Sequence, residues 1–451
     1  MALLDKDAFF CSNSQLELFE DIHTQVGIES SRFQKVFPVT SIDSSDALEF
    51  TIESGSDHMI DPSSTILILK SKIVHPNGED IAEPADDAGD PIKRASEVFP
   101  ICYFGSTRFR QCEVYLNDKL ISSSDSLYAY RSYIPTTISY SENTKNEQLG
   151  AAMYYRDSNP MQARANPGES HNKGARARFN KTRYSKSFET WTRLHSEIFL
   201  QPKFLLPDSK LKIRLVKADP AFCLMSGSDL HQYKILTEKA SLLVRCVEVS
   251  DSVRLSIAKR LLTTPAKYPV EKLLPKYFIK PRGTTDLSVP SLCTGILPNK
   301  VVIGFVQSEA LTGSYGLNPF NFEHVNIGSI VLRKDGNARP MPQIDLDFEN
   351  DIFMEGYMNF VHGTGRLFHN STCGITPHGM WKDGYTLFIY DLTPDENDGN
   401  SVNLVRSGKL SLEVNLRAPT TTNIAVIALF SYSDVILVDN KGQVSYDPGS
   451  S

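Results

Sequence analysis

Four side chains near the carboxyl-terminal third of this sequence are of the types that bind zinc. His362, His369 and His378 lie seven and nine residues apart, with Cys373 between the last two. Imidazole and thiolate groups are common zinc ligands, but ligand pairs on one strand or helix face usually stand two or four residues apart. No two histidines have that spacing, and no H-x-H pair occurs in the chain. We therefore expect no metal here.

A second group consists of carboxylates, which could bind calcium. Asp391, Asp395, Glu396 and Asp398 fall within one turn-rich segment, but the D-x-D-x-D-G order of a calcium loop is absent. A solvated turn is the better interpretation. The glycines at 313–316 lack the G-K-[ST] ending of a phosphate-binding loop.

Motifs for catalysis are also missing. The chain has no G-x-S-x-G elbow, no H-E-x-x-H helix, and no cysteine with a neighbouring histidine in a known catalytic setting. Seven scattered cysteines form neither a disulfide framework nor a C-x-x-C motif, so we expect buried, reduced thiols. The sequence predicts neither an enzyme nor a cofactor.

The densest positive charge lies between residues 164 and 186, where seven cations face one acid, Glu169, with Phe179 and Tyr184 among them. This composition favours contact with DNA or an acidic partner. The alternative is a solvated basic loop, because Asn, Pro and Gly make the segment irregular. The formal charge of −6 argues against a protein that mainly coats nucleic acid. The cations are Arg164, Lys173, Arg176, Arg178, Lys181, Arg183 and Lys186.

The elements that must position these groups have β patterns. Residues 301–306 are a β-branched and aromatic run, and residues 410–416 alternate apolar with polar side chains. Asn117-Asp118 and Asp335-Gly336 are dipeptides that favour hairpin turns. Strands joined by hairpins and shaped loops indicate antiparallel β-sandwiches.

Fewer helices are expected. Residues 127–138 have helical spacing, but Pro135 predicts a break or kink. Residues 253–262 and 352–361 predict two further short helices. Trp191 is expected in the core.

At 451 residues the chain exceeds the about 250–300 residues at which a single core stops growing, so two domains are expected. Its longest apolar runs are far shorter than the roughly 20 residues of a membrane-spanning helix. Four prolines between 265 and 281 predict a semi-rigid connection that avoids sheet pairing. The predicted units are an amino-terminal arm (1–30), a first sandwich (31–249), a proline-rich linker (250–290), a second sandwich (291–440) and a tail (441–451).

Several motifs along the chain can be compared with a known protein family. They are LLDKDAFFCSNSQLELF (3–19), CEVYLNDKLISSSDSLYAYRSYIPTTISY (112–140), LPNKVVIGFV (297–306), GSYGLNPFNFEH (313–324) and DGYTLFIYDLTPD (383–395). In this order they resemble the amino terminus, the middle of the first half and the second half of the major capsid proteins of Polintons (Mavericks) and adintoviruses. The matches span most of the chain.

The resemblance implies an all-β double jelly roll, two antiparallel eight-stranded sandwiches in one chain, with short helical insertions. It implies a structural protein whose homotrimers are pseudo-hexameric and tile an icosahedral shell around double-stranded DNA. A single-jelly-roll penton or minor capsid protein and a maturation protease are the implied partners. The location would be the virion, assembled in the host cell, in cytoplasm or nucleus, without secretion; the amino terminus MALLDKDAFF has no signal-peptide pattern.

Four aromatic residues have two open interpretations, either packing between copies in and between trimers or packing in each subunit's own core. They are Phe320, Phe322, Tyr357 and Phe360. A different class of function also stays open, an intracellular lectin-like β-sandwich module that binds ligand through aromatic loops. A jelly-roll enzyme is disfavoured by the missing metal ligands.

Overall fold

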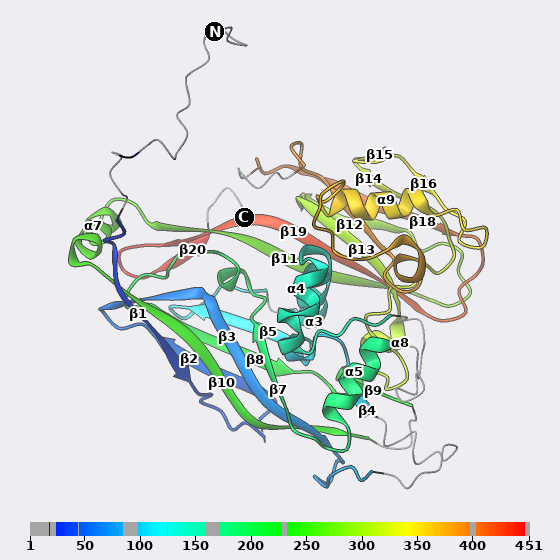
Figure 1. Ribbon diagram of the computed structural model, residues 1–451. Helices are drawn as coiled ribbons and strands as arrows, with labels where there is room; N and C mark the ends of the chain where they lie inside the picture. The colour runs from blue at the N-terminus through cyan, green and yellow to red at the C-terminus, as the bar shows by residue number, and fades with distance from the viewer. Residues whose placement is uncertain are drawn as a thin grey trace, which may run out of the picture.

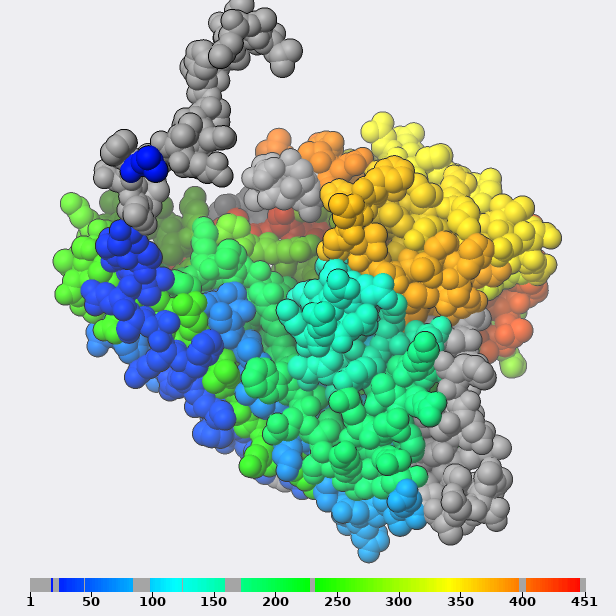
Figure 2. Space-filling model, in the orientation of Figure 1, coloured from blue at the N-terminus to red at the C-terminus, as the bar shows by residue number. Residues whose placement is uncertain are grey.

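A computed structural model describes residues 18, 24–43, 45–83, 98–123, 125–158, 172–227, 232–396 and 403–446. Two β-sandwiches lie against each other, with α7 (Asp251–Leu261) at one end of the molecule and most other labelled helices between the middle of the view and the opposite end (Figure 1). Figure 2 shows the first half, blue to green, at the lower left and the second half, yellow to red, at the upper right. No helix of the described residues is long and apolar enough to cross a membrane.

The first sandwich contains two four-stranded sheets and a short two-stranded ladder, all antiparallel. One sheet has the order β1 (Ile28–Val36), β10 (Lys234–Val249), β3 (His58–Val74), β7 (Phe188–Arg193). The other has the order β2 (Ala47–Glu53), β8 (Lys210–Lys217), β5 (Phe109–Leu116), β6 (Lys119–Leu120). The ladder pairs β4 (Val98–Pro100) with β9 (Leu224–Ser226).

The second sandwich repeats this arrangement with two five-stranded sheets. One has the order β11 (Ala266–Lys280), β19 (Ile424–Val438), β13 (Lys300–Gln307), β17 (Leu387–Asp391), with β20 (Val444–Tyr446) on β19. The other has the order β12 (Val289–Ile296), β18 (Ser407–Leu416), β14 (Ile327–Lys334), β15 (Asn337–Ala338), with β16 (Ile344–Asp345) on β14.

Both sandwiches have one topology. When the eight main strands of each are numbered along the chain, one sheet has the order 1-8-3-6 and the other 2-7-4-5, in both halves. This order is the jelly roll, in which every strand except the fifth pairs with one that is distant in sequence, and the fourth and fifth strands form a hairpin. The fold is therefore an all-β double jelly roll, as the sequence predicts.

Short helices fill the connections. In the first roll they are α2 (Phe104–Thr107), α3 (Tyr128–Ser139), α4 (Glu142–Asn146), η2 (Gln148–Ala152), α5 (Lys173–Thr182), η3 (Glu197–Phe199) and α6 (Pro220–Cys223). Along the chain, α7 (Asp251–Leu261) lies between the two rolls, close to the helix predicted at residues 253–262. The second roll has α8 (Ser308–Thr312), α9 (Met354–Gly363) and η4 (Pro377–Trp381).

The local patterns of several strands determine their structure. β18 alternates buried and more exposed residues, which fits its predicted half-buried face. β13 is buried almost throughout and is a central strand of its sheet, paired with β17 on one side and β19 on the other. Both predicted hairpins form, with positive φ at Asn117, Asp118, Asp335 and Gly336.

The proline-rich segment is a correction to the sequence analysis. Residues 266–280 form β11, which pairs with β19 along its whole length, Pro269 opposite Val435 and Pro275 opposite Leu429. The prediction that prolines keep this segment out of a sheet was wrong because β11 is an edge strand, where a residue without an N–H is tolerated. β11 thus belongs to the second roll.

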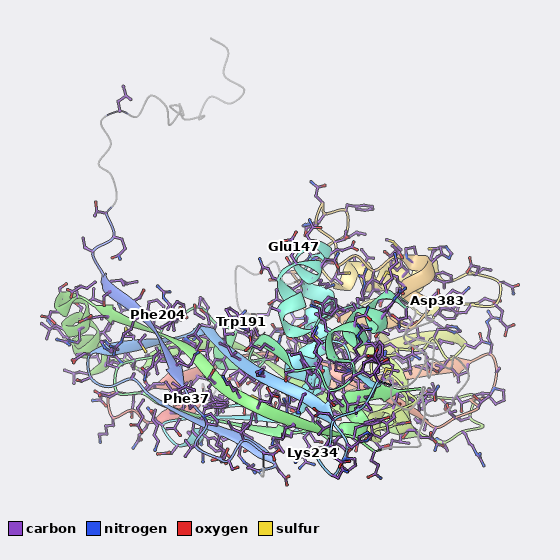
Figure 3. All side chains as sticks on the ribbon, turned by 60° about the horizontal axis from the view of Figure 1, so that its bottom comes forward. Phe37, Glu147, Trp191, Phe204, Lys234 and Asp383 are labelled. Atoms are coloured by element: carbon purple, nitrogen blue, oxygen red, sulfur yellow. The ribbon has the colours of Figure 1, made fainter. Side chains whose placement is uncertain are left out.

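Two other expectations were wrong, the first of them in part. The sequence predicts a break or kink at Pro135, but α3 is not broken there, and ten of its twelve residues are buried; this packing outweighs the proline penalty of about 3 kcal/mol. Trp191 is 50% exposed because β7 alternates and turns Phe188, Thr190 and Thr192 inward. Figure 3 places Trp191 over the strands of the first roll.

The hydrophobic cores of the two rolls are not separate. One cluster joins aromatic residues of α3 to the second roll, including Tyr130, Tyr133 and Phe320. The other lies mainly in the first roll but includes Tyr268 of β11 and Ile436 of β19. The long strands β11 and β19 therefore extend past the second sandwich and complete the core of the first.

Candidate assembly surfaces

The aromatic loop between α8 and β14, residues 313–326, lies in the contact region between the two rolls, called the seam from here on. Phe320 stacks on Tyr133 of α3, with ring centroids 3.9 Å apart and an interplanar angle of 10°. Tyr130 meets Phe320 edge to face at 5.6 Å and donates a hydrogen bond from its hydroxyl to the Pro319 carbonyl at 2.9 Å. Gly304 leaves room for the Phe322 ring, since a Cβ there would lie 2.6 Å from it. The loop is thus covered by helix α3 of the first roll.

The burial of the aromatic set favours packing in the subunit's own core for three of the four residues. Phe320 is 1% exposed, and Phe322 and Phe360 are fully buried, so these three belong to the chain's own core. Packing of their rings against a neighbouring copy does not fit this burial. Tyr357 is only partly buried and donates to the Ile375 carbonyl at 2.9 Å.

A buried ion pair holds the same seam. Arg178 of α5 has no exposed surface; its Nη2 lies 2.7 Å from Asp157 Oδ1, and its Nε donates to the Pro100 carbonyl at 2.8 Å. Asp157 also accepts from Asn318 Nδ2 at 3.1 Å, and its carbonyl accepts from the Tyr385 hydroxyl at 2.9 Å. Burial opposes the charge on Arg178 and lowers its pKa, but the neighbouring Asp157 carboxylate favours the charge, so the pKa of Arg178 lies above its usual value. The pair therefore links both rolls.

A buried amine lies further along the seam. Lys145 of α4 donates from Nζ to the carbonyls of Thr137 and Cys373, the latter at 2.9 Å. Burial lowers its pKa to about 8, and no carboxylate of the described residues forms an ion pair with it. Arg156 Nη1 donates to the Gly374 carbonyl at 2.8 Å, so cations of the first roll bind backbone oxygens of the second.

The predicted basic loop is partly a helix. Asn172 caps α5 by accepting from the Ala175 N–H at 3.2 Å, so residues 173–182 are regular. Arg178 points inward, which the sequence analysis did not expect, and Arg164 lies outside the described residues. Five cations are exposed and form no ion pair with a described acid. They are Lys173, Arg176, Lys181, Arg183 and Lys186.

Two of these cations lie over aromatic rings. Lys181 Nζ is 5.5 Å from the Tyr155 ring centroid, and Arg183 Cζ is 5.9 Å from that of Tyr184. Such a surface attracts anions through its net charge. α5 lies at the end of the molecule opposite α7 (Figure 1).

The residues considered for metal binding do not converge. His378 Nδ1 lies 3.5 Å from Asp351, His362 Nε2 lies 3.6 Å from Glu396, and Cys373 is buried. Across the described ranges no group of three or more His, Cys, Asp or Glu side chains could hold a metal ion. Asp391 pairs with Lys300 at 3.5 Å, and Asp398 is outside the described residues. The six described cysteines are free and buried, as predicted.

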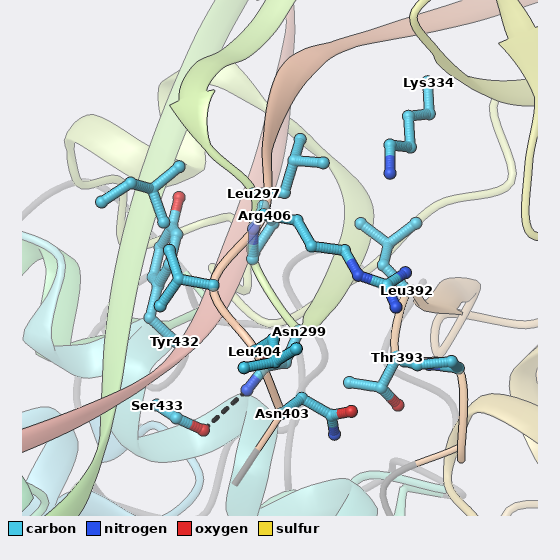
Figure 4. A pocket seen from close by; sticks show the side chains of 14 residues that line it. Leu297, Asn299, Lys334, Leu392, Thr393, Asn403, Leu404, Arg406, Tyr432 and Ser433 are labelled. Atoms are coloured by element: carbon cyan, nitrogen blue, oxygen red, sulfur yellow. Dashed lines mark hydrogen bonds between the residues drawn. The ribbon is translucent and has the colours of Figure 1, made fainter. Parts of the chain in front are cut away.

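Two cavities deserve comparison with a ligand site. The one in Figure 4, where Asn299 Nδ2 donates to Ser433 Oγ at 2.8 Å, encloses about 40 Å³, room for little more than water. A larger one of about 660 Å³ lies beneath α7 and is lined by Met59, Leu206 and Ile257 among others. Its one arginine, Arg254, already pairs with Asp57 and Asp251.

The sequence analysis did not predict strand β1 and began the first sandwich at residue 31. All seven residues between Ile28 and Val36 are exposed, and Phe33 is 57% exposed. Polar residues dominate IESSRFQKV, so neither alternation nor an apolar run signals a strand. Only pairing with β10 shows it.

Comparisons with known proteins agree with this architecture. No family model matches the chain. A curated relative, an uncharacterized protein of Caenorhabditis elegans, is 25% identical over 401 residues, covering 88% of this chain and 92% of the relative. This relative carries no functional description.

Solved structures match over nearly the whole length. A chain of the cryo-EM structure of the Sputnik virophage superposes with a TM-score of 0.65 at 12% identity, covering 100% of this chain and 95% of that chain. The mavirus major capsid protein gives 0.54 at 10% identity (99% and 97% covered), and the Faustovirus major capsid protein 0.51 at 9% (94% and 93%). The chain thus has the double jelly-roll fold of viral major capsid proteins.

Proposed function

We propose that this chain is a major capsid protein, a structural and non-enzymatic subunit whose homotrimers tile an icosahedral shell around double-stranded DNA. The observation that carries the proposal is the pair of complete jelly rolls with identical strand order, fused through continuous cores. Two similar domains in one chain let a threefold oligomer offer six similar sides to a lattice, while their differences specify which sides meet.

The biological setting follows from the motifs that resemble Polinton and adintovirus capsid proteins. In that setting the protein occupies the virion, and a single-jelly-roll protein closes the vertices. In this proposal the first roll begins with β1 at residue 28 rather than 31, and the second begins with β11 at residue 266 rather than 291 and ends with β20 at residue 446.

The exposed face of α9 is a better candidate for contacts between copies than the buried Phe320 and Phe322. Met354 and Met358 stand four residues apart on α9 and are exposed, and the partly buried Tyr357 lies between them. Flexible methionine side chains adapt readily to a partner surface.

Purified protein tests the assembly directly. Native mass spectrometry should give a trimer of about 151 kDa, three times 50.4 kDa, and electron microscopy should show closed shells. A stable monomer that binds sugar would instead support the lectin-like module. In shells that form around DNA, changing Lys173, Arg176 and Lys181 to Ser should lower nucleic-acid content; unchanged content would remove α5 from the DNA contact.

A further inference from the structure

Strands β1 and β11 occupy equivalent positions but protect their edges differently. Each is the first strand of its roll, lies at the edge of its sheet and pairs with the roll's last strand. Lysines and prolines on an edge strand discourage pairing with another chain. β11 carries both, whereas β1 has one lysine, Lys35, and no proline. The blocking residues of β11 are Lys267, Pro269, Lys272, Pro275, Lys276 and Lys280.

β1 is also unusually exposed for a strand of a sandwich. Its seven central residues are exposed whichever face they occupy, including the large apolar ring of Phe33. An edge strand in this position offers a row of backbone N–H and C=O groups to a further strand. Among the described residues, only β10 pairs with β1.

The regular part of β1 is symmetrical about Phe33. Its pairing with β10 shifts between Ile28 and Ser30, then continues without interruption from Ser30 to Val36. Phe33 is the midpoint of that segment. If two such segments pair antiparallel about Phe33, Arg32 faces Gln34 and Lys35 faces Ser31 of the other copy. No like charges oppose each other, and the two Phe33 rings form a cross-strand aromatic pair.

An ion pair joins β10, the strand that pairs with β1 at Phe33, to the next strand, β3. Phe33 is opposite Arg245 of β10, whose Nη1 lies 3.1 Å from Asp61 Oδ2 of β3. The Asp61 carboxylate also accepts from the hydroxyls of Ser63 at 2.6 Å and Ser64 at 2.8 Å. The edge is therefore held in place before any partner arrives, which reduces the entropy lost on binding.

We propose that a second copy of this chain binds at the free edge of β1, the two β1 strands pairing antiparallel across a twofold axis at Phe33. The proposal rests on the capsid function and adds the contact that joins trimers. A twofold contact uses the same surface on both partners, so it suits neighbouring trimers and not the threefold interior of one trimer.

A cysteine at the axis tests this geometry. In Phe33→Cys the two new thiols face each other with Cα atoms about 4.5–5.5 Å apart, inside the range for a disulfide. Mild oxidation of assembled protein should give a covalent dimer on a non-reducing gel. The matched control is Ser31→Cys, whose two copies lie about 13 Å apart along the strands, four residues at roughly 3.3 Å each, and should stay monomeric on the gel.

The outcomes separate this contact from the capsid function. If the wild type forms shells but Phe33→Cys gives no more covalent dimer than Ser31→Cys, the β1 contact is overturned. The capsid proposal then still stands. Dimers cross-linked at position 33 without shells support the contact and count against the capsid. A blocked edge, Ser31→Lys with Phe33→Lys, should leave trimers intact and reduce shell formation at least tenfold; unchanged shells also overturn the contact.

Discussion

Phe320 and Phe33 are both aromatic residues of β-rich segments, yet one is enclosed by the chain and the other is open to solvent. Phe320 lies on a loop of the second roll that helix α3 of the first roll covers. Phe33 lies on an edge strand that no described element covers on that side. Aromatic content alone therefore does not locate an association surface. The helices inserted between strands decide which rings remain available.

The greatest loss of stability is expected when the enclosed ring of Phe320 is removed. Phe320→Ala removes the ring stacked on Tyr133 and leaves a cavity, which should lower the free energy of unfolding by about 3–5 kcal/mol. Urea denaturation of the purified protein measures it. Phe368→Ala is the control, since Phe368 is 94% exposed and its loss should change stability by no more than about 0.5 kcal/mol. Equal effects would contradict the burial of the loop.

The ion pair at the seam gives the next effect. Arg178→Met leaves the buried Asp157 carboxylate without its charged partner and should destabilise the fold by about 3 kcal/mol. Arg176→Met, on the exposed face of the same helix, should be nearly neutral in the same thermal or urea unfolding experiment. If both variants unfold alike, Arg178 does not hold the rolls together.

Lys145 should give a smaller effect on the free energy of unfolding, and this effect should depend on pH. The pKa of Lys145 is about 8 in the fold against 10.5 unfolded, so between these values the unfolded chain binds more protons and stability rises with pH. From pH 8 to 9.5 this gain should be roughly 1–2 kcal/mol. Lys145→Met should lack it, as measured by the difference between the two unfolding curves at each pH. A parallel pair of curves would show that Lys145 titrates normally.

Local patterns in the sequence were sufficient for much of the fold. The β18 alternation, the hairpin dipeptides and α7 each depend on neighbouring residues alone, and the structure confirms them. The strand at β11 could not be predicted this way, since the tolerance of Pro269 and Pro275 depends on which side of the strand has a partner.

The candidate surfaces were harder to predict for the same reason. Arg178 has the same sequence context as its exposed neighbour Arg176, and only its place beside Asp157 makes it structural. The inward position of Phe320 depends on α3, nearly 190 residues earlier, as the 189-residue separation of Tyr130 and Pro319 illustrates. Contacts over such distances leave no local signal.

The sharing of strands between the two cores has a consequence for biosynthesis. Tyr268, Val270, Ile436 and Val438 are buried in the cluster that lies mainly in the first roll. A nascent chain that has left the ribosome up to residue 265 therefore lacks part of the interior of its first domain. The core of that domain can be completed only after residues 436–438 have been made, so the last steps of folding involve both halves together.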